Sequence, residues 1–148
     1  MIYIIIGIAV LILDIVTKRA AVAALMGGDS IPIIKDVFHL TYVENTGIAF
    51  GMLEDKRIVF ITLSVIILVV LAVYFFKAPC HDLWLKLGIA LVFSGSIGNL
   101  IERVANGVVV DFLDFRLINF PVFNIADIAV CVGAGALIIH FLFSETKQ

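Results

Sequence analysis

Four long apolar segments and two polar connections alternate along the chain. The apolar segments cover about residues 1–25, 58–76, 83–103 and 120–143. At about 1.5 Å per residue, a helix of some 20 residues crosses a hydrocarbon core of roughly 30 Å. The pattern therefore predicts a membrane α protein, a four-transmembrane-helix bundle.

The two longer connections, residues 27–57 and 104–119, share one side of this bundle, because four spans place both termini on the other side. Each connection holds a strand-like stretch, at residues 37–43 and 108–115. Backbone groups near membrane depth must pair their hydrogen bonds. We therefore expect small β elements packed on the helix ends, within a single integral-membrane domain of residues 1–148.

Composition supports the membrane assignment. The chain is 63% hydrophobic and 15% charged with a mean hydropathy of +1.20, whereas a soluble domain is about half apolar and a quarter charged. A net charge of -2 argues against a nucleic-acid partner. Asp14 interrupts the first apolar run and no basic stretch precedes that run, which favours a retained helix over a cleaved signal peptide. The distribution of Lys and Arg leaves the orientation open, because several of them are candidate site residues.

Several kinds of chemistry lack their motifs. Cys80 and Cys131 are far apart without a CxxC, so the sequence predicts neither a disulfide framework nor a zinc site, and Cys131 is expected to be a small packing residue. The chain has no HExxH of a zinc protease and no GxSxG of a serine hydrolase. With no metal or cofactor expected, acid–base chemistry by carboxylates is the enzyme interpretation that remains.

Asp111 and Asp127 are the most informative residues. Asp111 ends a run of valines, and Asp127 lies near the start of the last apolar segment. An acid at membrane depth is costly and is by default a functional hypothesis, so two of them suggest a paired-acid site. Asp114 is a competitor of Asp111, because the two point to opposite faces of an extended strand and alternation does not say which face meets the bundle.

Other polar residues have ordinary explanations beside functional ones. Asp14 and Lys18, four apart on one helix face, fit either an ion pair with Lys18 reaching the interface or a site role. Asn45 lies in a stretch that resembles an ordinary turn. Asn99 and Arg103 are one helical turn apart. Since an unpaired Arg at the bilayer centre costs about 2.5–3.5 kcal/mol, Arg103 must be interfacial or paired with an acid.

Asn124 and the acids as a group also allow a second interpretation. Asn124 fits the N-cap of the last helix, with Asp127 favoured by the helix dipole. The intramembrane acids could serve ion passage in a non-enzymatic four-helix membrane protein, such as a transporter subunit. They gather near one interface in the expected arrangement, however, and do not form a file across the bilayer.

Five short blocks give the chain a resemblance to a known family. In order, they are Asp14-x-x-Thr17-Lys18, Asn45-Thr46-Gly47-Ile48-Ala49-Phe50, Gly98-Asn99-x-x-Glu102-Arg103, Val110-Asp111-Phe112 and Phe123-Asn124-Ile125-Ala126-Asp127. Each block alone is a weak signal, but five in this order on four spans are specific. The chain resembles the lipoprotein signal peptidases (signal peptidase II), bacterial aspartic peptidases that process prolipoproteins.

The resemblance implies a catalytic dyad and a set of supporting residues. The dyad would be Asp111 and Asp127, and the substrate a diacylglyceryl-modified prolipoprotein, cut just before its lipidated cysteine. It also implies a bacterial cytoplasmic membrane protein with both termini cytoplasmic, extracytoplasmic β elements, contact with membrane lipid, and inhibition by globomycin-type peptides. The implied substrate-binding or dyad-supporting residues are Asp14, Asn45, Asn99, Arg103 and Asn124.

The chain also departs from the family pattern. Ser94-Gly95 stand where the family usually has Gly-Gly, Glu102 where it has Asp, and Ile128 where a Ser is common. Because Glu102 keeps the charge but lengthens the arm, we assign it no site role from sequence. Two neighbouring carboxylates cannot both ionise easily, so the dyad is expected to share one proton near neutral pH.

Overall fold

The computed structural model describes residues 1–47, 57–77 and 82–144. The predicted strands are present with slightly different bounds, and the first strand of the hairpin was not predicted. Residues 48–56 of the first connection, which include the end of the second sequence block, lie outside the described residues. The elements are α1 (Ile2–Leu25), β1 (Ile31–Ile34), β2 (Phe38–Asn45), α2 (Arg57–Lys77), α3 (Leu83–Ala105), β3 (Val109–Phe115), the short 3-10 helix η2 (Arg116–Ile118) and α4 (Ile125–Ser144).

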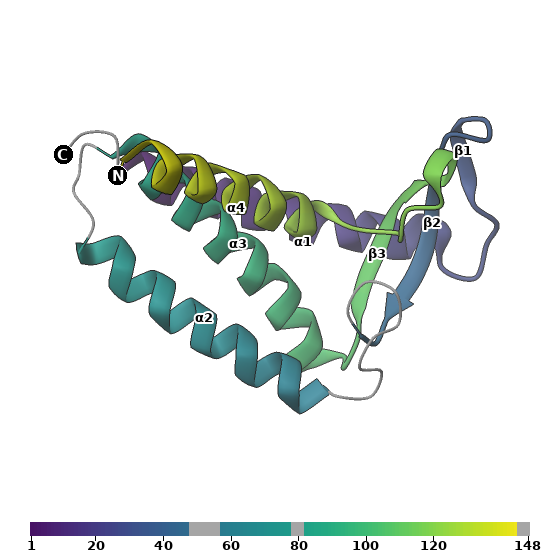
Figure 1. Cartoon of the computed structure of the whole chain (residues 1–148). Helices are drawn as coiled ribbons and strands as arrows, with labels where there is room; N and C mark the ends of the chain where they lie inside the picture. Colours follow the sequence, from purple (N-terminus) through teal and green to yellow (C-terminus); the bar gives the residue numbers. More distant parts are fainter. Residues whose placement is uncertain (48–56, 78–81, 145–148) are drawn as a thin grey trace.

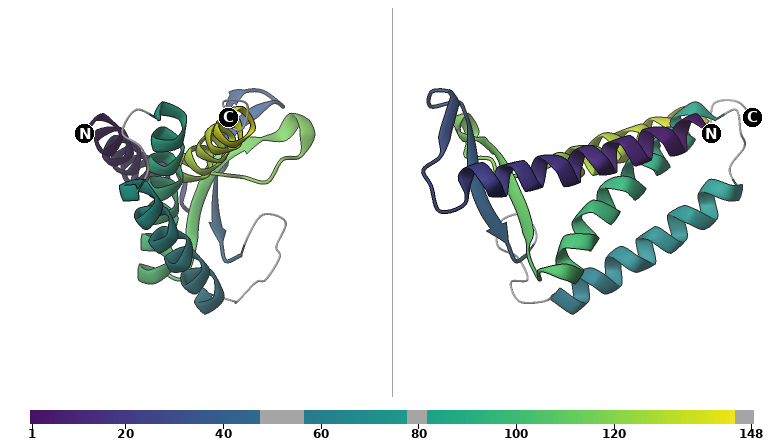
Figure 2. Two further views of the ribbon diagram at one scale, coloured as in Figure 1. Left: turned by 60° about the vertical axis from the view of Figure 1, so that its left-hand side comes forward. Right: turned by 180° about the vertical axis from the view of Figure 1, so that it is seen from behind.

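The helices form a bundle with the sheet at one end. Helices α1, α3 and α4 run side by side, and α2 lies along the other side of α3 (Figure 1). The start of α1 and the end of α4 lie together at the end away from the sheet, as the view from behind also shows (Figure 2). Helix α3 contacts each of the other three helices and is therefore the centre of the bundle.

Three of the four described helices, α2, α3 and α4, are long and apolar enough to cross a membrane. Helix α1 has 24 residues but carries Asp14, Lys18 and Arg19 within its second half, so its own span remains a prediction. Most side chains of α2 are exposed and apolar, with Phe76 82% exposed. Such a surface is what lipid contact requires, because a helix that is apolar all round must be covered.

Glycines allow α3 and α4 to approach closely. A Cβ on Gly88 would lie 2.9 Å from the Gly133 carbonyl oxygen, and one on Gly133 would lie 2.8 Å from the Gly88 oxygen. Small residues at such crossings are typical of membrane helices. Gly98 of α3 has a further role, because its missing side chain makes room for Asp14.

The sheet is antiparallel with strand order β1-β2-β3. It therefore joins the two long connections, and its register pairs Val43 with Asp111 after an irregularity between Leu40 and Val43. The end of α1 packs under the sheet through Ala21 and Leu25, which meet Phe112 of β3. This packing fixes β3, and with it Asp111, against the helices.

Candidate active site

Asp111 lies in the middle of β3 and is only 2% exposed. The side chain of Asn45, at the end of β2, donates from Nδ2 to Asp111 Oδ2 over 2.8 Å. Asn124, just before α4, donates from Nδ2 to Asp111 Oδ1 over 2.6 Å. Each oxygen of the buried carboxylate therefore has an amide donor from a different part of the chain.

Asp127 is held by the start of α4. Its backbone N–H donates to Asn124 Oδ1 over 2.9 Å, while the Asn124 N–H donates back to Asp127 Oδ2 over 3.1 Å. This reciprocal pair is a capping box, in which two otherwise unpaired donors of a helix start are satisfied. The N-cap interpretation of Asn124 is thus confirmed, and the same side chain also donates to Asp111.

Asn99 of α3 joins the two sides. It donates from Nδ2 to Asp127 Oδ1 over 2.8 Å, and its Oδ1 accepts from Asn124 Nδ2 over 3.1 Å. Asn124 therefore contacts Asp111, Asp127 and Asn99 while being fully buried. Amide side chains thus link the two carboxylates into one network.

Asp14 and Lys18 form a buried ion pair below this network, with Nζ 2.9 Å from Asp14 Oδ2. Lys18 is only 2% exposed, so the ion pair offered by the sequence is present, but the lysine does not extend outward to the membrane interface as that alternative supposed. The lysine is satisfied inside the protein instead. Asp14 Oδ1 accepts from the Ala126 N–H over 2.9 Å, which ties α1 to the first turn of α4.

Arg103 reaches over the site from the last turn of α3. Its Nη2 donates to the Gly47 carbonyl oxygen over 3.3 Å, and its guanidinium lies 5.4 Å from the centre of the Phe60 ring. Within the described residues, its hydrogen bond thus goes to the backbone and not to one of the acids expected as partners. Cation–π contact with Phe60 helps to stabilise the charge in an apolar setting.

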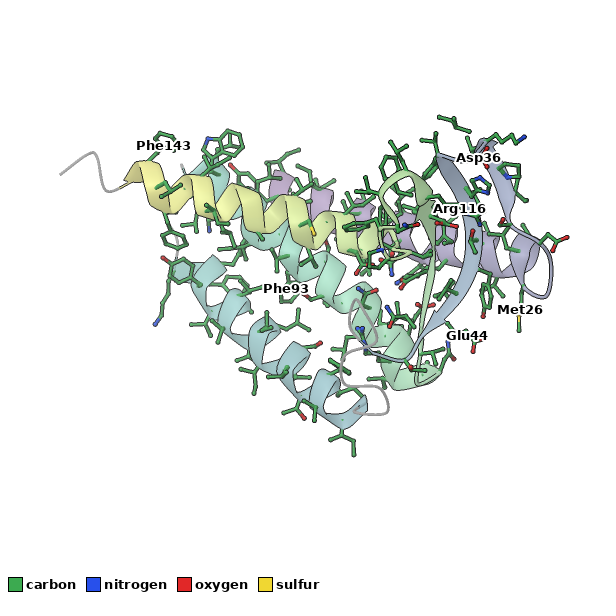
Figure 3. The ribbon with its side chains drawn as sticks, turned by 45° about the vertical axis from the view of Figure 1, so that its right-hand side comes forward. Met26, Asp36, Glu44, Phe93, Arg116 and Phe143 are labelled. Carbon is green, nitrogen blue, oxygen red and sulfur yellow. The ribbon has the colours of Figure 1, made fainter. Side chains whose placement is uncertain are left out.

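A cavity of about 530 Å³ opens beside the two aspartates. Many polar atoms gather at the sheet end of the molecule, where Glu44 and Arg116 lie, while Phe143 lies at the opposite end (Figure 3). A second, apolar cavity of about 260 Å³ between α1, α2 and α3 contains none of the candidate residues. The larger cavity is lined by Asn45, Gly47, Ser64, Ser96, Asn99, Arg103, Asp111, Phe120, Pro121, Val122, Phe123, Asp127, Ile128, Val130, Cys131 and Val132.

Burial raises the pKa of Asp111 to about 6, because a charged carboxylate is poorly solvated there. The charge of Asp127 raises this pKa further, whereas the Asn45 and Asn124 hydrogen bonds and the charge of Lys18 lower it. A carboxyl group that titrates near neutral pH can carry either protonation state during a reaction, as general acid–base work requires.

Asp114, the competitor of Asp111, belongs to another cluster. Its Oδ2 accepts from Thr41 Oγ1 over 2.6 Å and from Arg116 Nε over 2.8 Å. Although burial acts to raise the pKa of Asp114, these two hydrogen bonds outweigh it and hold the pKa below its usual value. Asp114 does not line the larger cavity, so the structure brings Asp111 and not Asp114 to Asp127.

The chain is similar to known proteins along nearly its whole length. A sequence model of the family described as signal peptidase (SPase) II matches residues 6–143. The chain belongs to the signal peptidase II family. The lipoprotein signal peptidase of Halothermothrix orenii is 44% identical over 147 residues, covering 99% of this chain and 98% of that protein. The lipoprotein signal peptidase of Clostridioides difficile is 45% identical over 148 residues, covering 100% of this chain and 99% of that protein.

Solved structures support the family membership. One, described as a bacterial membrane enzyme, superposes with a TM-score of 0.89 at 36% identity and covers 99% of this chain and 91% of that one. A second solved structure superposes with a TM-score of 0.87 at 37% identity and covers 95% of this chain and 92% of that one. The likeness extends over nearly the whole of each chain, so it includes both the helices and the sheet.

The cavity is lined by five of the seven residues named from the sequence, and the other two, Asp14 and Asn124, are buried at the start of α4. Glu102 was assigned no site role from sequence, and a site role for Lys18 was left open. Lys18 and Glu102 contact the network, and Glu102 Oε2 accepts the Val110 N–H over 2.9 Å. The signal for both was their presence in the motif blocks. Cys131 is exposed and lines the cavity, so the expectation of a packed core residue is wrong. Among the described residues, no three His, Cys, Asp or Glu side chains are grouped to hold a metal ion.

Proposed function

We propose that this protein is a membrane aspartic endopeptidase that removes signal peptides from diacylglyceryl-modified prolipoproteins, cutting just before the lipidated cysteine. Asp111 and Asp127 would form the catalytic dyad. The observation that carries the proposal is that these two acids, from β3 and α4, line one cavity and share Asn124 as a hydrogen-bond partner. The family membership supplies the substrate class.

The proposed reaction uses one shared proton. The ionised aspartate takes a proton from a water molecule, whose oxygen attacks the scissile carbonyl carbon. The protonated aspartate donates to the carbonyl oxygen as that oxygen becomes negative. Collapse of the tetrahedral intermediate breaks the C–N bond, and the leaving amine takes a proton from the dyad. The two pKa values belong to the pair, so either aspartate can start as the acid.

The supporting residues divide by position. Asn45, Asn99 and Arg103 reach the cavity, where their N–H groups are available to the substrate backbone or to the acids. Asn124 and Asp14 are buried at the start of α4 and orient its first turn. An amide network of this kind lowers the reorganisation needed in the transition state, because the donors are already in place.

The membrane would bind part of the substrate. We propose a single domain with α1 as the fourth span, both termini cytoplasmic and the sheet extracytoplasmic, in the inner membrane. The cavity wall formed by Val130, Cys131 and Val132 is apolar, and the diacylglyceryl chains would lie in lipid beside it. Each buried CH₂ contributes about 0.8 kcal/mol. Globomycin-type peptides would occupy the same cavity.

The test is cleavage of a diacylated prolipoprotein by purified protein in detergent, with Asp111→Asn and Asp127→Asn made separately. Each variant is expected to lose at least about 100-fold in kcat, because acid–base catalysis by positioned groups contributes roughly that much or more. Asp114→Asn is the matched control, since it changes an equivalent side chain in the same strand outside the cavity. Near-normal processing by either dyad variant refutes the proposal, and an ion-conducting protein would show no cleavage at all.

A further inference from the structure

Lys18 is a buried charge directly below the proposed site. Its ammonium lies within reach of three acceptors, at 2.9 Å from Asp14 Oδ2, 2.9 Å from Asn99 Oδ1 and 3.3 Å from Glu102 Oε2. A buried ammonium needs such partners to offset its lost hydration. Lys18 is not part of the cavity lining among the described residues, so any effect on the reaction must pass through its neighbours.

We propose that Lys18 is a positioning residue that fixes the Asn99 amide so that its N–H groups face Asp127. An ammonium carries only donors, so the oxygen of Asn99 must face it. That orientation turns Nδ2 toward Asp127 Oδ1, at 2.8 Å. A flipped amide would set its NH₂ against the ammonium and its oxygen against the carboxylate. The inference rests on the function proposed above.

Asn124 extends the effect to the other aspartate. Its Nδ2 donates both to Asn99 Oδ1 over 3.1 Å and to Asp111 Oδ1 over 2.6 Å. The Asn99 oxygen therefore accepts from the lysine and from Asn124 at once. One buried charge thus sets the donor direction of two amides, and these amides donate to both carboxylates of the dyad.

Glu102 holds the ammonium from the side of the sheet. Its Oε2 accepts from the Val110 N–H over 2.9 Å, directly before Asp111, and also contacts Lys18. Asp14 lies on the other side of the ammonium, so acceptors from α1 and α3 enclose it, and Glu102 ties it to β3. This arrangement leaves Lys18 little freedom to move away from Asn99.

The experiment replaces Lys18 by Met, which has similar bulk and no donor, both in the natural sequence and with Asn99→Ala. We expect K18M to lower kcat roughly 10- to 100-fold, the effect of one hydrogen bond to a charged group, with KM changed less than about twofold. With Asn99 already replaced, K18M is expected to change kcat less than about threefold. The acid limb of kcat/KM is expected to move to higher pH, because the charge of Lys18 lowers the pKa of Asp111.

The control is Arg19→Met, which removes an exposed charge from the same helix and is expected to leave kcat unchanged. Thermal unfolding in detergent checks that each variant is folded. If K18M does not fold, every variant is made again with Asp14→Asn added. This second change removes the carboxylate charge that K18M leaves without its lysine. Equal loss of kcat with and without Asn99, or no loss, overturns the inference. If the natural protein fails to cleave the substrate, the proposed function fails instead.

Discussion

Asn124 both caps a helix and binds Asp111, one of the two proposed catalytic acids, and two substitutions separate these roles. Asn124→Ala removes the acceptor of the Asp127 N–H and the donors to Asp111 and Asn99. Asn124→Ser keeps a short oxygen that can cap the helix, because Ser is among the preferred N-cap residues. Its hydroxyl is too short to replace the amide that reaches Asp111.

The magnitudes follow from these contacts. Loss of the cap costs about 1 kcal/mol of stability, which Ser restores. Loss of the 2.6 Å hydrogen bond to Asp111 removes roughly 1.5–3 kcal/mol of interaction with a charged group. If that interaction is made in the transition state, kcat falls about 10- to 150-fold in both variants.

The assay pairs thermal unfolding in detergent with cleavage of a diacylated prolipoprotein. The Asn124→Ser variant is expected to unfold at a higher temperature than Asn124→Ala, while both variants cleave the substrate equally slowly. If Asn124→Ser recovers activity in step with stability, Asn124 acts only as a cap and the link to Asp111 has no catalytic effect. Loss of activity in the Ala variant alone would refute the catalytic link in the same way.

Two further predictions concern stability. Since burial raises the pKa of Asp111 from 3.8 to about 6, the folded state holds this proton more tightly than the unfolded state. The free energy of unfolding is therefore expected to fall as pH rises from about 4 to 6, and above pH 6 the Asp111→Asn variant is expected to be more stable by up to roughly 3 kcal/mol. Denaturation at several pH values measures this difference. The same pH dependence in the natural protein and the variant would contradict the prediction. Gly98→Ala places a Cβ 2.5 Å from Asp14 Oδ2 and is expected to lower the unfolding temperature. The control is Gly135→Ala, whose added Cβ meets no atom within 4 Å and is expected to be neutral or slightly stabilising. Equal effects of the two glycine changes would contradict the packing argument.

The sequence predicted the four helices and one strand in each long connection well, because apolar length and alternation are local signals, but it missed β1. The residues of β1 carry a proline and three isoleucines, all exposed, so the alternation of a half-buried strand is missing. The strand forms because it pairs with β2, and such pairing is not visible in a single segment. For the same reason, alternation separated Asp111 from Asp114 but did not say which of them meets α4.

The site was predictable as a set of residues but not as a network. Arg103 was expected to be interfacial or paired with an acid, and its hydrogen bond among the described residues goes to the Gly47 carbonyl, a partner that the sequence did not indicate. For Lys18 the sequence allowed either an ion pair that reaches the membrane interface, because a long side chain usually reaches water, or a site role. It is instead buried, because Asp14 of its own helix and Asn99 and Glu102 of α3 meet it there. Sequence spacing reveals only the first of these contacts.

Because of the capping box at Asn124 and Asp127, the proposed active site can form only when the last helix joins the fold. Helix α4 is synthesised after every other described element, and until it docks, Asp111 lacks both its Asn124 donor and its partner acid. A nascent or truncated chain that ends before α4 lacks Asp127, so under the proposed mechanism it would hold half of the dyad and have no hydrolytic capacity. Under the same mechanism, the membrane would meet a competent peptidase only after α4 has docked on the rest of the fold.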